Sequence, residues 1–415
     1  MTLSWTSLSL KVWSLVQYAK HLPMTSPAPE IFWRESSDYC INYIDFLRYS
    51  SVNSNDILRQ DREKIPLHKK DIMKSTSLIL AGCMLLSSAI SHAVAAADTL
   101  PGSTEGAQIM QFTPSQDQTD LFSNVIYSQV KDGVALRQLR MSLLVPRNND
   151  LKPAIVYFPG GGFMTANHDK YIAMRMALAN AGYVVAAAEY RVIPDKFPAP
   201  LVDGKTAVRY LRAHAKEYNI DPARIAVLGD SAGGWLAQML GTTNGEKEYD
   251  KGDYPEQSSD VQGVATIYGI SNLLNIGEGF PEQIQQVHRS AAVTEALLVH
   301  GAAFRTFAGA TIDSDPKKAL VASPMGHITG HEPPFLIMHG SADTLVSPQQ
   351  SAQLYQALKA KKDTADYVLV EGAEHGDIHW YQPQVIDHVV GWFKHTLGAP
   401  TKQNAPAKAD KKSNL

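Results

Sequence analysis

Short apolar runs alternate with amphipathic segments along the chain from about residue 120 onward. The apolar runs extend over five or six residues and carry almost no charge. Strands that are apolar on both sides are typical of a parallel sheet covered by helices on both faces. The amphipathic segments between them have the spacing of helices packed on such a sheet. The pattern predicts a three-layer α/β domain with a mostly parallel central sheet.

The expected elements follow one another in a regular order. A strand, a sharp turn and a helix are predicted together over residues 224–241. Apolar runs predict the other strands within residues 123–130, 139–146, 153–163, 183–192, 261–270, 333–343 and 366–377. Helical spacing predicts further helices within residues 172–182, 200–219, 348–362 and 383–397.

The alternation stops between Gly269 and Pro333. Residues 281–309 have helical spacing, which predicts a small helical insertion at about 276–322. The insertion follows a strand end, where ligands bind in parallel sheets. We therefore expect it to act as a lid over the site, with an ordinary surface excursion as the alternative.

A secretory signal peptide is predicted at residues 73–97. Met73 and Lys74 form a basic start, an apolar stretch follows, and small residues around Ala95 suit an A-x-A cleavage site. The apolar stretch is too short for a membrane span, so no stable membrane insertion is expected. Because such a signal normally begins a chain, we expect translation to start at Met73. Residues 1–72 are then a non-native or unstructured extension, with a genuine small N-terminal region as the alternative.

After the signal peptide, we expect a main domain at residues 98–398 and a tail at residues 399–415. Residues 399–415 are rich in Lys, Ala, Pro and Asn and poor in apolar side chains, which predicts a disordered tail. Export, to the periplasm or out of the cell, is expected from the signal. Anchoring as a lipoprotein through Cys83 is a minor alternative, because Leu80-Ala81-Gly82-Cys83 resembles a lipoprotein box.

Charge and cysteine content narrow the classes of function. The net charge is −3 and there is no large basic block, so nucleic-acid binding is not expected. The two cysteines, Cys40 and Cys83, both lie before the main domain. A protein without the N-terminal segment has no thiol, which excludes disulfides and cysteine catalysis and argues against structural zinc.

The motif Gly229-Asp230-Ser231-Ala232-Gly233 follows an apolar strand and opens a helix. In this context G-x-S-x-G predicts a nucleophilic serine on a strained turn, with glycines two positions away because larger side chains would clash. A plain glycine-rich turn is the alternative. We interpret Asp230 as a cap of the helix.

A serine nucleophile needs a base and an orienting carboxylate, in the chain order Ser, Asp or Glu, His for sheets of this kind. Asp343 comes just past the strand that ends at Gly340, and His375 comes just past the next strand. Ser231, Asp343 and His375 are therefore the predicted catalytic triad. The alternative is that Asp343 is only a turn residue and that His375 is only a loop residue near Asp377.

Other histidines offer a weak case for a metal site. His379 lies four residues past His375, and His327 and His331 have the same spacing, which suits zinc only on a helix. The intervening glycines and prolines argue against helix, so no metal site is predicted. His339 lies at the end of a strand and is expected to be packed.

A glycine loop, Pro159-Gly160-Gly161-Gly162, follows the strand that ends at Phe158. Glycines let backbone N–H groups approach a substrate oxygen closely. With the N–H of Ala232, those of Gly161 and Gly162 are the predicted oxyanion donors. A phosphate cradle is the rival interpretation, but the phosphate-binding glycine patterns are missing from the sequence.

Residues of about 120–397 resemble the α/β-hydrolase fold, specifically the esterase/lipase branch related to hormone-sensitive lipase. Within that branch they are most similar to bacterial bifunctional acetylxylan/feruloyl esterases (BD-FAE-like). The resemblance is carried by the stretches YFPGGGF, EYRVIPDKFPAPLVDGKTAVRYLRA, IDPARIAVLGDSAGGWLAQMLG, ASPMGHITGHEPPFLIMHGSADTLVSPQQSAQLYQAL and VEGAEHGD.

The resemblance implies the same triad and oxyanion donors, and Tyr190, Arg191 and Asp203 as structural supports. This chain departs from the family in one respect, because Pro159 stands where a histidine usually precedes the glycines. That departure leaves the choice of the donor pair open.

The expected function is hydrolysis of a carboxylic ester through an acyl-enzyme. The expected substrate is a small-molecule or oligosaccharide ester, with short acyl groups or acetyl and feruloyl groups of plant polysaccharides. No metal or organic cofactor is implied. The alternatives are an amidase or peptidase of the same fold, and a noncatalytic binding module, which predicts a missing triad member.

Overall fold

The computed structural model describes residues 100–403. The chain divides into two compact units, Met1–Met110 and Gln111–Leu415. Of the first unit only residues 100–110 are described, and they form turns with exposed side chains. The predictions for residues 1–72 and 73–97, including Cys40 and Cys83, lie outside the described residues. The second unit carries all the helices and strands described below.

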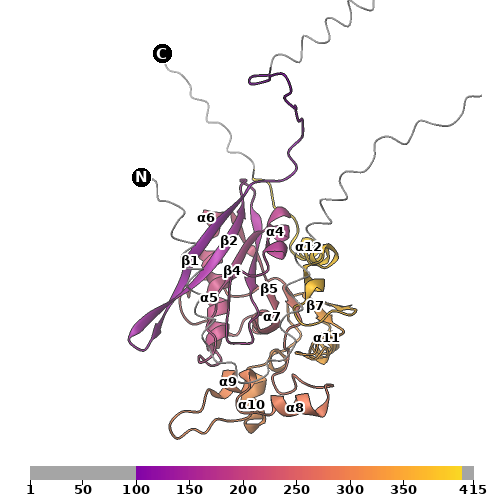
Figure 1. Ribbon diagram of the computed structural model, residues 1–415. Helices are drawn as coiled ribbons and strands as arrows, with labels where there is room; N and C mark the ends of the chain where they lie inside the picture. Colours follow the sequence, from indigo (N-terminus) through magenta and orange to yellow (C-terminus); the bar gives the residue numbers. More distant parts are fainter. Residues whose placement is uncertain (1–99, 404–415) are drawn as a thin grey trace, which may run out of the picture. The chain divides into compact units, whose positions relative to one another are not determined.

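An eight-stranded sheet forms the centre of the second unit (Figure 1). Its order is β1-β2-β4-β3-β5-β6-β7-β8. The strands are β1 (Thr119–Asp132), β2 (Ala135–Pro146), β3 (Lys152–Phe158), β4 (Val184–Ala188), β5 (Ile220–Asp230), β6 (Val264–Ile267), β7 (Phe335–Gly340) and β8 (Ala365–Val370).

Strand direction agrees with the sequence prediction. The pairs β1–β2 and β2–β4 are antiparallel, and every pair from β4 through β3 to β8 is parallel. The carboxyl ends of β5, β7 and β8 therefore meet at one edge of the sheet. The mostly parallel sheet is confirmed.

Helices cover both faces of the sheet, as the apolar strands require. On one face, α4 (Ile172–Asn180) and α12 (Pro383–Leu397) share a core with the strands. On the other face, α5 (Ala199–Ala213), α7 (Ser231–Thr242) and α11 (Gln349–Lys361) do so. The predicted helix over 200–219 divides at His214 into α5 and α6 (Ala215–Tyr218). Within residues 100–403, no helix is both long and apolar enough to cross a bilayer.

The insertion between β6 and β7 contains short helices, and α8, α9 and α10 gather beside one another in Figure 1. Phe197 donates its amide to Leu298 O in α9, and Trp235 Nε1 of α7 donates to Ala322 O. These contacts fix the insertion to the main domain. Its elements are α8 (Glu282–His288), α9 (Thr294–His300), η3 (Ile312–Ser314), α10 (Pro316–Val321) and η4 (Pro324–Gly326).

The helical prediction for residues 281–309 is wrong for its last third. Residues 301–309 are irregular, with a single bridge between Phe304 and Phe307. Gly301 has a φ of 88°, which ends α9 because the left-handed region does not continue a helix.

The prediction of a disordered tail from residue 399 is wrong for residues 399–401. Leu151 and Thr401 exchange two backbone hydrogen bonds, and Arg224 binds Ala399 O and the Thr401 hydroxyl. Residues 399–401 are thus tied to the sheet by backbone pairing, which composition does not reveal. Residues 404–415 lie outside the described part of the chain.

Candidate active site

Ser231 occupies the turn between β5 and α7, with a backbone φ of 53°. A non-glycine residue rarely adopts this left-handed conformation, so the predicted strained turn is confirmed. A Cβ at Gly229 would overlap the Gly233 carbonyl, and a Cβ at Gly233 would overlap the Phe158 carbonyl. The two glycines are therefore required by close backbone packing under the serine.

Asp230 precedes α7, but its side chain caps no helix amide. One carboxylate oxygen instead accepts from the Tyr157 hydroxyl at 2.7 Å and from the Gly160 amide at 3.0 Å. The prediction of a helix cap is wrong because these donors, brought close by the fold, attract the carboxylate away from the helix. Burial raises the pKa of Asp230, and the hydrogen bonds from Tyr157 and Gly160 oppose that shift.

The three predicted triad residues meet at the edge of the sheet. Ser231 Oγ lies 2.8 Å from Nε2 of His375, and Nδ1 of His375 lies 2.7 Å from Oδ2 of Asp343. A carboxylate only accepts hydrogen bonds, so Nδ1 carries the proton and the serine hydroxyl donates to Nε2. A hydroxyl, an imidazole and a carboxylate in this sequence have the geometry of an activated nucleophile.

Asp343 is held by more than the triad histidine. Its Oδ1 accepts from the amides of Leu345 and Val346, each at 2.9 Å. Its Oδ2 lies 3.2 Å from Nε2 of His339, which is fully buried as expected. Burial of Asp343 disfavours its charge, but the contacts with His339 and His375 outweigh burial and hold the pKa well below its usual range. The carboxylate therefore remains ionised beside the imidazole.

The glycine loop lies next to the triad. Gly160, Gly161 and Gly162 line the same cleft as Ser231 and His375. Within residues 100–403, the amides of Gly161 and Gly162 donate to no protein acceptor. Ala232 is buried directly behind the serine. The loop thus has free donors at the place where an oxyanion would form.

The cleft above these groups has a volume of about 500 Å³. The ring of Tyr268 lies against His375, with centroids 4.5 Å apart. Among the described residues, those that line the cleft all lie outside the predicted lid at 276–322. They are Tyr157, Gly160, Gly161, Gly162, Lys170, Tyr171, Asp230, Ser231, Tyr268, Leu345, His375, Gly376 and Tyr381.

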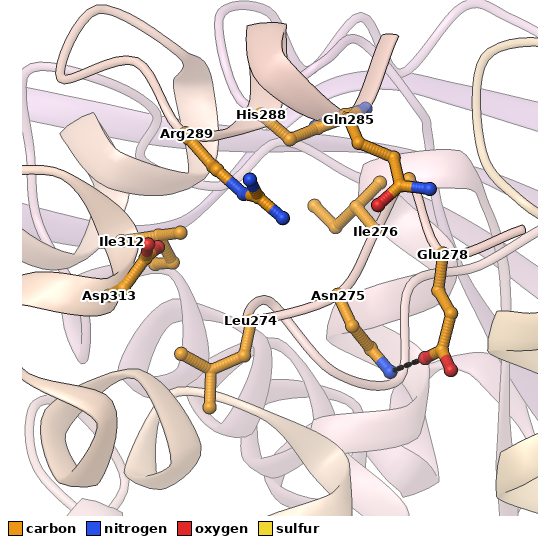
Figure 2. Close-up of a pocket in the computed structure, with 10 residues that line it drawn as sticks. Leu274, Asn275, Ile276, Glu278, Gln285, His288, Arg289, Ile312 and Asp313 are labelled. Atoms are coloured by element: carbon orange, nitrogen blue, oxygen red, sulfur yellow. Dashed lines mark hydrogen bonds between the residues drawn. The ribbon is translucent and has the colours of Figure 1, made fainter. Parts of the chain in front are cut away.

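A second cavity, of about 280 Å³, lies where the insertion meets the loop after β6 (Figure 2). Arg289 points into it from beyond α8, and Asp313 and Glu278 contribute carboxylates. No triad or glycine-loop residue lines this cavity. In the part of the chain that the structure describes, no cluster of three His, Cys, Asp or Glu side chains is arranged for a metal.

Tyr190 contacts the glycine loop, and Arg191, the next residue in the chain, pairs with Asp203. The Tyr190 hydroxyl donates to Pro159 O at 2.7 Å. The Arg191 guanidinium donates to both oxygens of Asp203, which is buried in α5. These contacts agree with the supporting role that the resemblance implies.

Replacing Asp203 by alanine is expected to lower the free energy of unfolding by about 3 kcal/mol, because it leaves a largely buried guanidinium unpaired. Urea unfolding of the variant and of wild type measures the change. Glu256→Ala, at an exposed position, is the control. A loss below about 1 kcal/mol, as for an exposed ion pair, would contradict this role.

A family model described as BD-FAE matches residues 141–358, more than half of the chain. The chain belongs to the BD-FAE family. This BD-FAE member is 31% identical to Esterase LipC of Mycobacterium tuberculosis over 54% of this chain and 53% of LipC. It is 26% identical to isoprenylcysteine alpha-carbonyl methylesterase ICME of Arabidopsis thaliana, over 64% of each chain. The chain spans about half the length of the curated relatives it matches.

Solved structures similar to this BD-FAE member share its architecture. An acetyl ester-xyloside bifunctional hydrolase from Caldicellulosiruptor lactoaceticus has 25% identity and a TM-score of 0.53, over 65% of this chain and 92% of that one. A truncated carbohydrate esterase from gut microbiota has 24% identity and a TM-score of 0.56, over 68% and 98%. The α/β-hydrolase fold and the esterase/lipase resemblance are thereby confirmed.

Several groups around the site of this BD-FAE member were not predicted. Lys170 and Tyr268 line the cleft, and His339 contacts Asp343. His339 stands four residues before Asp343, a spacing visible in the sequence, but only the turn after β7 brings the two together. No motif marks Lys170 or Tyr268, because their positions depend on how two loops fold onto the strand ends.

Proposed function

We propose that this protein is a serine carboxylic ester hydrolase that works through an acyl-enzyme. The observation that carries the proposal is the hydrogen-bonded series from Ser231 through His375 to Asp343, at the mouth of a cleft lined by the glycine loop. Relatives named as esterases, such as LipC and ICME, support the reaction class.

The first half of the reaction forms the acyl-enzyme. Ser231 Oγ attacks the ester carbonyl while Nε2 of His375 takes the hydroxyl proton. The negative charge on the carbonyl oxygen is stabilised by the amides of Gly161, Gly162 and Ala232. The tetrahedral species then releases the alcohol, which leaves with the proton held by His375.

The second half returns the free enzyme. Water replaces the alcohol, and His375 takes a proton from it as its oxygen bonds to the acyl carbon. The Oγ–acyl bond breaks, and Ser231 regains the proton as the carboxylic acid departs. Throughout both halves Asp343 orients the imidazole and stabilises its cation.

The substrate class we propose is a short-chain acyl ester, or an acetyl or feruloyl ester of a plant-polysaccharide fragment. The cleft of about 500 Å³ suits a small substrate. Tyr157, Tyr171, Tyr268 and Tyr381 line it, and tyrosine combines an apolar ring with a polar tip. Two proteins of similar structure, a carbohydrate esterase and an acetyl ester-xyloside hydrolase, support this class of substrate.

Export is proposed with the substrate, on the sequence of residues 73–97 alone. Polysaccharide fragments are met outside the cytoplasm, so an exported esterase would have access to them.

A panel of substrates tests the proposed reaction. Nitrophenyl acetate, butyrate and octanoate, acetylated xylan and methyl ferulate are compared with nitroacetanilide. We expect turnover of the acetate and butyrate, less of the octanoate, and at least about a hundredfold less of the anilide. Equal turnover of ester and anilide would favour the amidase alternative, and no turnover of any ester would favour a binding module.

A further inference from the structure

Three carbonyl groups of the glycine loop, those of Pro159, Gly160 and Gly161, accept hydrogen bonds from elsewhere in the domain. The Tyr190 hydroxyl donates to Pro159 O, and the Lys170 ammonium donates to Gly160 O at 2.9 Å. Gly161 O accepts from the amides of Met164 at 3.0 Å and Thr165 at 3.2 Å. The loop is therefore fixed peptide by peptide, and only one of these donors is charged.

The bond from Lys170 acts on the peptide that joins Gly160 to Gly161. The Gly160 carbonyl and the Gly161 amide are opposite ends of one planar unit, so fixing the carbonyl sets the direction of the N–H. A charged donor on the oxygen also polarises the unit, which makes the N–H a stronger donor on its other side. Gly161 lines the cleft, and its amide donates to no protein acceptor within residues 100–403.

The peptide between Gly160 and Gly161 is also closely surrounded by neighbouring groups. The Gly160 amide is bound by Asp230, and a Cβ at Gly160 would lie 2.6 Å from the Asp230 carboxylate. A Cβ at Gly161 would overlap the Thr165 carbonyl. The backbone is closely surrounded on both sides of this peptide, and the hydrogen bond from Lys170 fixes the Gly160 carbonyl between them.

Lys170 is itself placed by a buried side chain. Arg175, in α4 and only 2% exposed, donates Nη1 to His168 O at 2.8 Å and to Lys170 O at 3.2 Å. Tyr171 follows with a φ of 55°, which turns the chain into α4. The backbone that presents the lysine is thus built into the domain, although the lysine side chain borders the open cleft.

We propose that Lys170 is a positioning residue of the oxyanion site. Its ammonium orients and polarises the Gly160–Gly161 peptide, so that the Gly161 amide binds the charged oxygen of the transition state better than the neutral ester. This inference rests on the proposed ester hydrolysis. The interaction is stronger in the transition state than in the ground state, so its loss lowers kcat and leaves KM nearly unchanged.

Lys170→Met tests the proposal because methionine keeps an unbranched side chain of similar length and lacks the ammonium group. Removal of a complete oxyanion donor costs a hundredfold or more, so we expect weakening of one donor to lower kcat about tenfold. Affinity for a trifluoromethyl ketone, which forms a tetrahedral adduct with an active serine, is expected to fall by the same factor as kcat/KM. Lys359→Met, on the exposed surface of α11, is the charge-matched control.

Restoring the ammonium separates positioning from general damage. Lys170→Cys alkylated with 2-bromoethylamine regains a side chain of nearly the same length and charge. We expect it to recover most of the lost kcat, with wild type treated in parallel because it carries Cys40 and Cys83.

Three results would overturn the assignment of Lys170. They are an unchanged kcat in Lys170→Met, a joint change in KM and melting temperature with no selective loss of kcat, and no recovery after alkylation. A failure of the proposed ester hydrolysis itself would give a different result. In that case wild type itself hydrolyses no ester, or Ser231→Ala is as active as wild type.

Discussion

Replacement of Ser231 by alanine is expected to lower kcat for nitrophenyl acetate by about 10⁶-fold. In the proposed mechanism the hydroxyl is the only group of the triad that bonds to the acyl carbon, and it lies 2.8 Å from Nε2 of His375. Alanine keeps the Cβ and fits the same backbone turn. Folding is therefore preserved, and circular dichroism and melting temperature are expected to match wild type.

A matched serine and a covalent probe complete this experiment. Ser341 also follows a strand of the sheet, but its hydroxyl accepts from the Gly372 amide and takes no part in the triad. Ser341→Ala is expected to keep kcat within about twofold of wild type. A fluorophosphonate is expected to add to the peptide that contains Ser231 in wild type and to leave the alanine variant unmodified. Substantial activity or labelling in Ser231→Ala would remove Ser231 as the nucleophile.

Asp343→Asn is expected to lower kcat by about 10⁴-fold with the fold intact. Asparagine has nearly the same shape, but its amide group can donate where the carboxylate only accepts. The Nδ1 proton of His375 then loses its acceptor, and the imidazole no longer presents an unprotonated Nε2 to Ser231. Steady-state kinetics of the variant measure the loss. Asp313→Asn, in the second cavity, is the control, and a loss below about tenfold would contradict the role of Asp343.

The same substitution predicts how stability depends on pH. The folded protein holds the pKa of Asp343 well below its usual range, through contacts with His339 and His375 that outweigh burial. A carboxyl group with a lowered folded pKa stabilises the protein above its unfolded pKa of about 4, and that contribution is lost as the pH falls. The difference in unfolding free energy between wild type and Asp343→Asn is therefore expected to be largest above about pH 5 and to shrink toward about pH 2. A difference that grew on acidification would have the wrong sign.

The regular elements were the most predictable part of the fold. Helix α12 begins at Pro383 and ends at Leu397, as its helical spacing predicts. The single helix expected over 200–219 and the helical segment expected over 281–309 were less well predicted. The first is interrupted at His214, and in the second α9 ends at Gly301, where the φ of 88° leaves the helical region.

The three triad residues were found from sequence because each stands where an apolar strand stops. Parallel strands carry their carboxyl ends to one edge, so this placement already implied proximity. Asp230 shows the limit of the same reasoning. Its position before a helix predicted a cap, whereas Tyr157 and the Gly160 amide, distant in sequence, take its carboxylate.

The succession of strands and helices along the chain, the motif at Ser231 and the positions of Asp343 and His375 after strands are local properties. The amino-acid sequence alone determined them. The contacts of Lys170 with Gly160 O, of His339 with Asp343 and of Thr401 with Leu151 were decided only by the tertiary structure. In each contact, a loop or turn whose path no period along the chain predicts brings the two partners together. Such contacts depend on the path of loops between strands, and that path is set by packing of the whole domain rather than by neighbours in the chain.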